Sequence, residues 1–296
     1  MNQNEKELVN ILLLGFDISK WKPNDIEWKE INDFINDPIE SNRISNFKRP
    51  NKDGSWLIGK DNDSAKSSII GRRLMIELVN KMLSLDYNSI KFKRTQSNKP
   101  YLSTTTTISN KFSFNISHDS NWVIGIGSLI SDSIGIDIMD CKIPRNQKMS
   151  EFFDTMSSCF TDNEWKIINQ GKDDQSKIDL FFIHWCLKES YIKADGKGLN
   201  IELKSFEFII DQTNQTAQIF ILNDKKNKSI LNNYQFTYFK PFKNDKDNNN
   251  NSFVIAICLD LTNHNHNNNN NNALTNNIIT KDNLSIQILE SDFKIK

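Results

Sequence analysis

A glutamate and a lysine one helical turn apart are the residues of this chain best suited to chemistry. They are Glu189 and Lys193, in the segment FFIHWCLKESYIKADGKGL that begins at residue 181. Apolar residues mixed with strong helix formers, followed by Asp-Gly-Lys-Gly, predict a helix that stops at that point. Side chains four residues apart lie on one face of a helix. The pair could therefore act together on one substrate, or form an ordinary ion pair on a helix surface.

A second stretch, residues 112–140, reads FSFNISHDSNWVIGIGSLISDSIGIDIMD and contains a Ser-His pair and a GID strand. Together FNISH, GID and WCLKESYIKADGKGL resemble the phosphopantetheinyl transferases of the Sfp type. The hallmarks of that family are an S-H pair, a GxD strand and a W/F-x-x-K-E-S/A-x-x-K helix. The resemblance is closer to the eukaryotic aminoadipate-semialdehyde dehydrogenase phosphopantetheinyl transferases and covers roughly residues 10–260. The segments that carry it stand in the expected order: GRRLMIELV, KFKRTQSNKPYL, GIDIM, EFFDTM, FTDNEW and LKESYIKADGKGL.

The resemblance implies an enzyme that transfers the 4′-phosphopantetheine arm of coenzyme A to a serine of an apo acyl or peptidyl carrier protein. The other product would be adenosine 3′,5′-bisphosphate. Implied partners are carrier domains of fatty-acid and polyketide synthases and an aminoadipate reductase. The main alternative is a non-catalytic module that binds coenzyme A or carrier proteins. A phosphatase or nuclease with two metal ions is a weaker alternative, because the sequence lacks the clustered ligands that such a site needs.

The resemblance also implies the catalytic residues. Asp137, at the end of the GID strand, and Glu189 would hold Mg²⁺, with Mn²⁺ as a possible substitute. Mg²⁺ prefers oxygen ligands and binds through one or two carboxylates together with substrate phosphates. Glu189 would also be the base for the carrier serine, and Lys193 would reach the pyrophosphate. The bacterial pattern GxDxE has a further carboxylate where this chain has Met139, and Asp140 would point to the other face of the strand.

Coenzyme A would be held by two further segments and one upstream basic residue. Without the resemblance, the basic loop at 94–99 would be interpreted as solvated, and a lone histidine at a strand end as a surface residue. Lys60 is the preferred upstream residue for the 3′-phosphate, with Arg49 as the alternative. Lys188 should project about 100° away from Glu189 and is predicted to be peripheral. The full predicted coenzyme A site is Arg94, Thr95, Gln96, Ser97, Asn98, Lys99, Asn115, Ile116, Ser117, His118, Asp137, Glu189, Lys193 and Lys60.

The order of predicted elements indicates an α+β fold. A strand, helices and then about four strands occur twice, which predicts two similar lobes related by a pseudo-twofold axis. The resemblance implies the same arrangement, the 4′-phosphopantetheinyl transferase fold, with the active site in the cleft between the lobes. The N-terminal lobe should span 9–133 and the C-terminal lobe 134–262, with a loop at 50–63. Helices are predicted at 24–35, 37–47, 64–85, 147–159, 162–170 and 177–195.

Composition adds few constraints on function. Lysine plus arginine and aspartate plus glutamate number 37 each, so no overall charge points to nucleic acid or to a membrane surface. Four cysteines without CxxC spacing favour a reduced, cytoplasmic protein, and we expect a monomer. The segments 244–251 and 263–272 are asparagine-rich, which predicts disorder rather than a metal site at His264 and His266. The tail at 273–296 could add a strand or stay loose.

Overall fold

The computed structural model describes residues 10–104, 112–198, 201–224, 227–241, 252–262 and 284–289. The asparagine-rich segments predicted to be disordered, at 244–251 and 263–272, lie outside these residues. The chain divides into two units. The N-terminal unit comprises Met1–Thr95, Pro100–Ile130 and Thr280–Lys296, and the C-terminal unit comprises Gln96–Lys99 and Ser131–Ile279.

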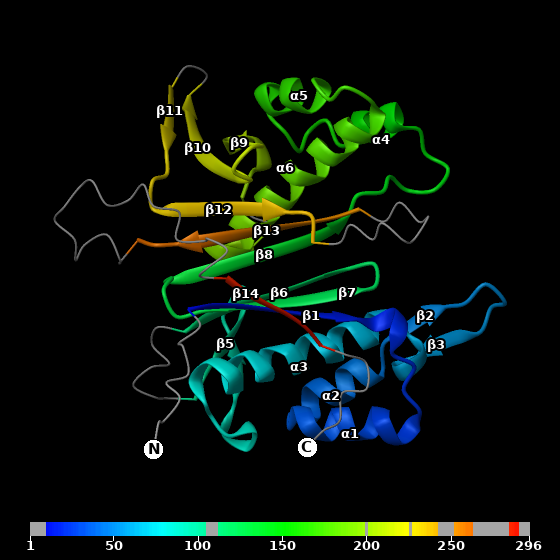
Figure 1. Ribbon diagram of the computed structural model, residues 1–296. Coiled ribbons are helices and arrows are strands. Elements are labelled where there is room, and N and C mark those ends of the chain that lie inside the picture. The colour runs from blue at the N-terminus through cyan, green and yellow to red at the C-terminus, as the bar shows by residue number, and fades with distance from the viewer. Residues whose placement is uncertain are drawn as a thin grey trace. The chain divides into compact units, whose positions relative to one another are not determined.

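The N-terminal unit packs one long helix on a sheet with the strand order β14-β1-β7-β6. Figure 1 shows this helix, α3, running along the sheet. The apolar run near residue 11 forms strand β1, which pairs with a neighbouring strand on each side. Asn62 caps the N-terminus of α3 by accepting a hydrogen bond from the Ser64 backbone N–H. The elements of the unit are β1 (Ile11–Asp17), α1 (Asp25–Ile35), α2 (Pro38–Ser45), β2 (Lys48–Pro50), β3 (Trp56–Ile58), α3 (Asp63–Leu83), β4 (Phe92–Arg94), β5 (Pro100–Leu102), β6 (Ser113–Asp119), β7 (Trp122–Ser128) and β14 (Leu284–Leu289).

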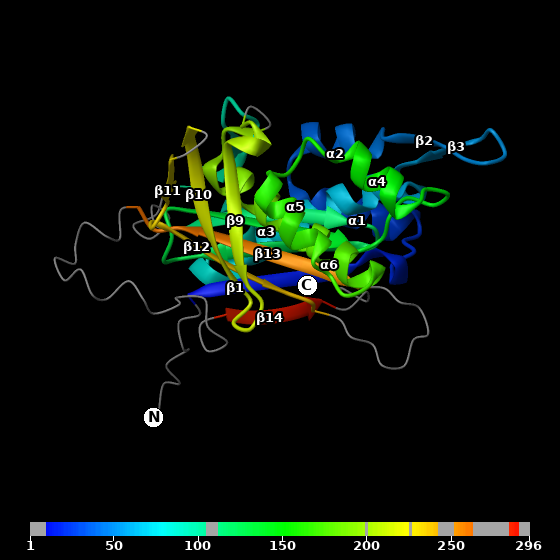
Figure 2. The same cartoon turned by 90° about the horizontal axis from the view of Figure 1, so that it is seen from above.

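The tail contributes a strand to the N-terminal unit. β14 pairs in parallel with β1, with Leu284 opposite Ile11 and Leu289 opposite Phe16. Figure 2 shows the two strands side by side. Leu289 packs against the apolar core of this unit. The sequence left open whether the tail would dock or stay loose, and the structure shows that residues 284–289 dock as an edge strand.

The C-terminal unit surrounds the helix that carries Glu189 and Lys193. Its larger sheet has the order β11-β10-β12-β13-β8, and β9 pairs with β10. The long helix α6 packs against β8 and β13 of this sheet (Figure 1). The elements are β8 (Ser133–Asp140), α4 (Met149–Thr155), α5 (Asp162–Asn169), α6 (Asp174–Asp195), β9 (Phe206–Asp211), β10 (Thr216–Asp224), β11 (Asn227–Ile230), β12 (Tyr234–Phe239) and β13 (Phe253–Asp260).

The mixed α+β composition predicted from the sequence is confirmed, and most of the predicted helices and strands form. The predicted loop at 50–63 is wrong in part, because Lys48–Pro50 and Trp56–Ile58 pair as an antiparallel hairpin around a turn that contains Gly54. The similarity of the two lobes and the cleft between them stay predictions. None of the described helices is both long and apolar enough to cross a membrane.

Candidate active site

Gly135 allows β8 and α6 to approach closely enough to bring Asp137 to the helix. A Cβ atom at Gly135 would lie 1.9 Å from the Ser190 carbonyl oxygen and 2.6 Å from the Ala194 nitrogen, both in the α6 backbone. Residues two apart on a strand share a face, so Asp137 points to the same side of β8 as Gly135. The Gly-x-Asp spacing therefore places a carboxylate directly beside the last two turns of α6.

Asp137 forms an ion pair with Lys193. The Lys193 Nζ donates to Asp137 Oδ1 at 2.7 Å and to the Ile136 carbonyl oxygen at 3.2 Å. Asp137 is 5% exposed, whereas the Lys193 side chain keeps 27% of its surface accessible. The Lys193 side chain is thus held by a strand and only partly covered.

Glu189 lies half-buried one turn before Lys193 on α6. Burial raises the pKa of the Glu189 carboxyl, the negative charge of Asp137 raises it further, and Lys193 partly opposes both effects. A carboxylate with a raised pKa is a better proton acceptor than an ordinary glutamate. The three predicted catalytic residues therefore occur together within the C-terminal unit.

The two carboxylates fit a magnesium ion in number and type. Burial, the larger effect, and the charge of Asp137 both raise the pKa of Glu189, and a divalent cation held by the two carboxylates would favour their charged forms. The described residues contain no group of three or more Cys, His, Asp or Glu side chains arranged to hold a metal ion. A site of two carboxylates matches the way Mg²⁺ binds together with substrate phosphates.

Met139 and Asp140 take the orientations expected from strand alternation. Met139 packs against the apolar core that contains α6. Asp140 pairs with Lys142 at 3.1 Å. Neither position adds a third carboxylate beside Asp137 and Glu189.

The predicted coenzyme loop contains the turn between β4 and β5, and Asn98 takes a left-handed conformation with φ of 63°. Thr95, Gln96 and Ser97 are exposed. Lys99 is different, because its Nζ donates to the carbonyl oxygens of Lys193 at 2.7 Å and of Ala194 at 3.2 Å. Burial lowers the pKa of Lys99. Its charge caps the C-terminal end of α6, where a cation is favourable.

Arg94 belongs to a cluster of three arginines around Glu40. Glu40 Oε1 lies 2.7 Å from Arg43, 2.5 Å from Arg72 and 3.1 Å from Arg94. Burial alone would raise the pKa of Glu40, but hydrogen bonds and charges from Arg43 and Arg72 lower it to about 2. Arg43 and Arg94 keep 50% and 41% of their side-chain surface accessible, whereas Arg72 keeps 11%.

Arg43 is therefore a basic residue upstream of α3 that the sequence analysis missed. Its signal in the sequence was weak, because one arginine in a short polar helix does not show that it meets Arg94.

The Lys60 ammonium lies 3.4 Å from Asp61 and 3.6 Å from Asp25. Arg49 lies on the exposed strand β2. The ion pairs of Lys60 do not include Glu40, and the roles of Lys60 and Arg49 stay predictions.

The Asn-Ile-Ser-His segment forms part of β6 in the N-terminal unit. Ile116 packs against the core beneath α3, close to Gly71. Asn115 and Ser117 alternate with it and point to the opposite face of the strand. His118 is exposed near the end of β6. Asn115 is half-buried and Ser117 is buried, so His118 has the most accessible side chain of the three, and their role toward coenzyme A stays a prediction.

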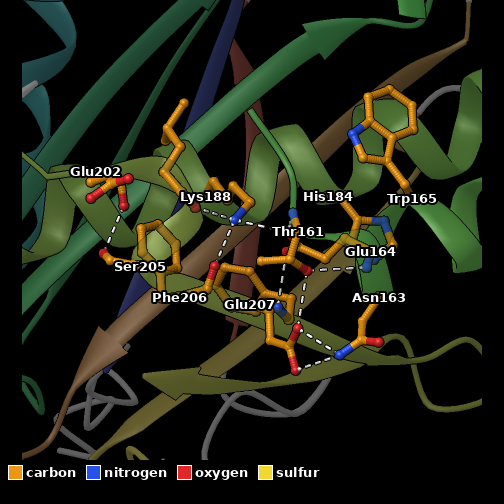
Figure 3. Close-up of polar contacts among 12 residues, drawn as sticks. Thr161, Asn163, Glu164, Trp165, His184, Lys188, Glu202, Ser205, Phe206 and Glu207 are labelled. Atoms are coloured by element: carbon orange, nitrogen blue, oxygen red, sulfur yellow. Dashed lines mark hydrogen bonds and ion pairs between the residues drawn. The ribbon is translucent and has the colours of Figure 1, made fainter. Parts of the chain in front are cut away.

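Lys188 lies outside the group of Asp137, Glu189 and Lys193, as predicted, but it is buried. Its side chain is 1% exposed and its Nζ lies 3.0 Å from Glu164 Oε2 on α5 (Figure 3). Helical geometry gave the direction of Lys188 correctly, but it could not show that α5 and β9 cover that side of the helix. Trp185 and Tyr191 likewise pack in the aromatic core of the C-terminal unit.

Comparisons with known proteins cover both units. A sequence model of the 4′-phosphopantetheinyl transferase superfamily matches residues 133–258, and a model described as 4′-phosphopantetheinyl transferase, N-terminal, matches residues 19–130. The L-aminoadipate-semialdehyde dehydrogenase-phosphopantetheinyl transferase of Xenopus laevis is 30% identical over 226 residues, 76% of this chain and 69% of the relative. The human protein of that name is 34% identical over 201 residues, 68% of this chain and 60% of the relative.

A bacterial relative is also similar. A 4′-phosphopantetheinyl transferase of Bacillus subtilis is 32% identical over 168 residues, 56% of this chain and 68% of the relative. The chain spans 59% and 60% of the length of the rat and human relatives that it matches. The matched regions include Asp137, Glu189 and Lys193.

Proposed function

This chain belongs to the 4′-phosphopantetheinyl transferase superfamily, and from that premise we propose that it transfers the 4′-phosphopantetheine arm of coenzyme A to a serine of apo carrier proteins. The observation that carries the proposal is the arrangement of Asp137, Glu189 and Lys193 between β8 and α6. The retention of all three groups favours a catalyst over a module that only binds coenzyme A.

The reaction needs a base, a group that stabilises phosphate charge and a fixed geometry. In the proposed step, the serine oxygen of the carrier attacks the phosphorus that bears the pantetheine arm. The bond between that phosphorus and the pyrophosphate bridging oxygen breaks, and adenosine 3′,5′-bisphosphate leaves. Glu189 accepts the serine proton, for which its raised pKa suits it. The Lys193 ammonium, held by Asp137, neutralises charge on the phosphate oxygens.

Asp137 and Glu189 would hold Mg²⁺. When bound, such an ion neutralises charge on phosphate oxygens and orients them. Mn²⁺ has similar preferences for oxygen ligands and could replace it. The protein's own contribution is to keep the two carboxylates in place through the close contact at Gly135 and the Lys193 ion pair.

For the adenosine end of coenzyme A we propose Arg94 together with Arg43 rather than Lys60. Both arginines converge on Glu40, which fixes their planar groups while leaving part of each side chain accessible. An arginine binds a phosphate through two parallel hydrogen bonds, so a fixed pair can hold a 3′-phosphate firmly. The polar side chains of Asn115, Ser117 and His118 on β6 are proposed to bind other parts of the same ligand.

The carrier partners are proposed from the names of relatives. An aminoadipate reductase carrier domain follows from the names of the vertebrate proteins, and carrier domains of fatty-acid and polyketide synthases are further candidates. The four described cysteines are free thiols, which suits a reducing compartment such as the cytosol. We propose that the chain acts there as a monomer.

The direct test is intact mass spectrometry of an apo carrier protein incubated with this protein, coenzyme A and Mg²⁺. We expect a mass gain of one phosphopantetheine arm, lost when a chelator is added and restored by excess Mg²⁺. Coenzyme A binding measured by calorimetry in the same samples serves as the control. Binding without any mass gain, across several carrier proteins and with Mn²⁺ also tried, would support the binding-module alternative instead.

A further inference from the structure

Lys188 and Glu164 form a fully buried ion pair that the proposed reaction does not use. The Lys188 side chain is 1% exposed and the Glu164 side chain is 0% exposed. The Lys188 ammonium lies 3.0 Å from Glu164 Oε2, and it donates to the carbonyl oxygens of Leu203 at 2.7 Å and Phe206 at 2.8 Å. A lysine has three N–H donors, so these acceptors satisfy all of them. The ring of Phe206 adds a cation–π contact at 4.3 Å.

Glu164 is fixed just as completely from its own side. Its Oε2 accepts from the Thr161 backbone N–H at 3.0 Å, and its Oε1 accepts from the Phe208 backbone N–H at 3.0 Å. The Thr161 hydroxyl accepts from the Glu164 N–H and donates to Glu207 at 3.0 Å. Figure 3 shows the resulting network, in which one carboxylate joins the start of α5, strand β9 and helix α6.

Lys188 lies on the same helix as the proposed catalytic residues Glu189 and Lys193, whereas Glu164 lies on α5. Glu189 follows Lys188 directly and projects about 100° further around the helix axis. Lys193 lies between one and two turns later. A rotation or shift of α6 that moved Lys188 would therefore also move Glu189 and Lys193 relative to Asp137 on β8.

Stability alone does not account for this pair. Removing two charges from water is costly, and apolar residues of similar volume often serve a fold as well as a buried ion pair. The pair restricts the rotation and position of α6 along its axis, because the Lys188 ammonium must reach one carboxylate and two carbonyl oxygens at once. Proposed catalytic groups need such support, since a misplacement of about 1 Å can cost about a hundredfold in rate.

We propose that Lys188 and Glu164 are positioning residues that set the rotation of α6 and so align Glu189 and Lys193 with Asp137. This inference rests on the proposed function for its catalytic consequence. Its structural content, a local fixation of the last turns of α6, does not depend on that function.

The test uses the double variant Lys188→Met/Glu164→Gln. A single substitution would leave one buried charge without its partner and could prevent folding, whereas the double variant removes both charges at nearly constant volume. The matched control is Arg73→Met/Glu77→Gln, another buried ion pair at 2.8 Å, on α3 of the N-terminal unit.

We expect the double variant to fold, to keep its KM for coenzyme A within about twofold, and to lose at least tenfold in kcat. Amide hydrogen exchange at residues 189–193 should accelerate at least tenfold, while exchange in α3 stays unchanged. The control should change neither kcat nor exchange in α6. The changes expected for the double variant are confined to α6. If the ion pair contributed only to the global stability of the protein, exchange at residues 189–193 would not change selectively.

Unchanged exchange at 189–193 in a folded double variant would overturn the proposal, as would a kcat within twofold of wild type. Absence of transfer by the wild-type protein would count against the proposed function alone. The exchange measurement would then still decide whether the pair fixes α6.

Discussion

His184 shows at the scale of one residue how burial controls protonation. It is 0% exposed on α6, and its Nδ1 donates to the Leu180 carbonyl oxygen at 2.8 Å. Its Nε2 is buried and has no hydrogen-bond partner in the part of the chain that the structure describes. Burial, the largest effect, lowers the pKa of His184 from 6.5 to about 4. The folded protein therefore keeps a neutral imidazole at pH values where the unfolded chain binds a proton.

This difference predicts a loss of stability in acid. The pKa of His184 is lower in the folded than in the unfolded protein. Its contribution to the free energy of unfolding is therefore fully present above pH 6.5 and is lost as the pH drops from 6.5 toward 4. Between pH 7 and pH 5 we expect His184 to contribute about 2 kcal/mol of that loss. His184→Gln cannot be protonated, so urea unfolding at the two pH values should show a loss smaller by that amount. An equal loss in both proteins would mean that His184 titrates normally in the fold.

The motifs that resemble the family predicted Asp137, Glu189 and Lys193 as catalytic residues, a role that stays a prediction, but they did not predict all of the surroundings of these residues. Asp137, Glu189 and Lys193 could be named because short motifs carry them. The environment of Lys188 could not be predicted, because its partners are distant in the sequence. Glu164 lies 24 positions earlier, and Leu203 and Phe206 lie 15 or more positions later. Arg43 was missed for a related reason: it meets Glu40 within α2, but Arg94, which shares that carboxylate, lies 54 positions further along the chain.

At the scale of elements, the contact between β8 and α6 determines the site. Gly135→Ala would place a methyl group 1.9 Å from the Ser190 carbonyl oxygen, and a helix backbone cannot move aside locally. We expect a loss of about 1–3 kcal/mol in unfolding free energy, as for other overpacked sites, together with a large loss of transfer. Thermal denaturation and the carrier mass assay measure the two effects.

Gly15→Ala on β1 is the matched control. Its added Cβ would lie 3.0 Å from Ile288 Cδ1, the end of a flexible side chain that can shift. It should therefore cost less stability than Gly135→Ala and leave transfer unchanged. If the two variants behaved alike, close packing of β8 on α6 would not be the reason for a glycine at 135.

Helices and strands with strong periodicity were predictable, and short polar ones were not. The 21-residue helix α3 follows from its apolar spacing. The hairpin of β2 and β3 was predicted as a loop, because its strands are three residues each and mostly exposed. β11 was missed because all four of its residues are exposed and lack apolar alternation.

At the scale of the whole molecule, the chain returns to its first sheet near residue 284. β14 covers the edge of β1 through six paired residues. Its pairing partner lies more than 260 positions earlier, so no local pattern could have predicted this contact. The domain limits of 9–133 and 134–262 and the cleft between lobes stay predictions.

Removal of residues 284–296 should destabilise the N-terminal unit. β1 would lose its parallel partner, and Leu289 would leave the apolar core, so we expect a loss of about 2 kcal/mol. Removal of 290–296 alone keeps β14 and is the control. Urea denaturation followed by tryptophan fluorescence compares the two truncations. Identical midpoints would show that β14 contributes nothing to stability.

The central claim is that Glu189, beside Asp137 and Lys193, carries out transfer of the phosphopantetheine arm. The most direct measurement is the rate of carrier mass gain with wild-type protein and with Glu189→Gln, using exposed Glu202→Gln as the control. We expect Glu189→Gln to lose about a hundredfold or more in rate, the size typical of a lost general base, while its melting temperature and coenzyme A binding change little. Transfer at the wild-type rate by Glu189→Gln would contradict the account.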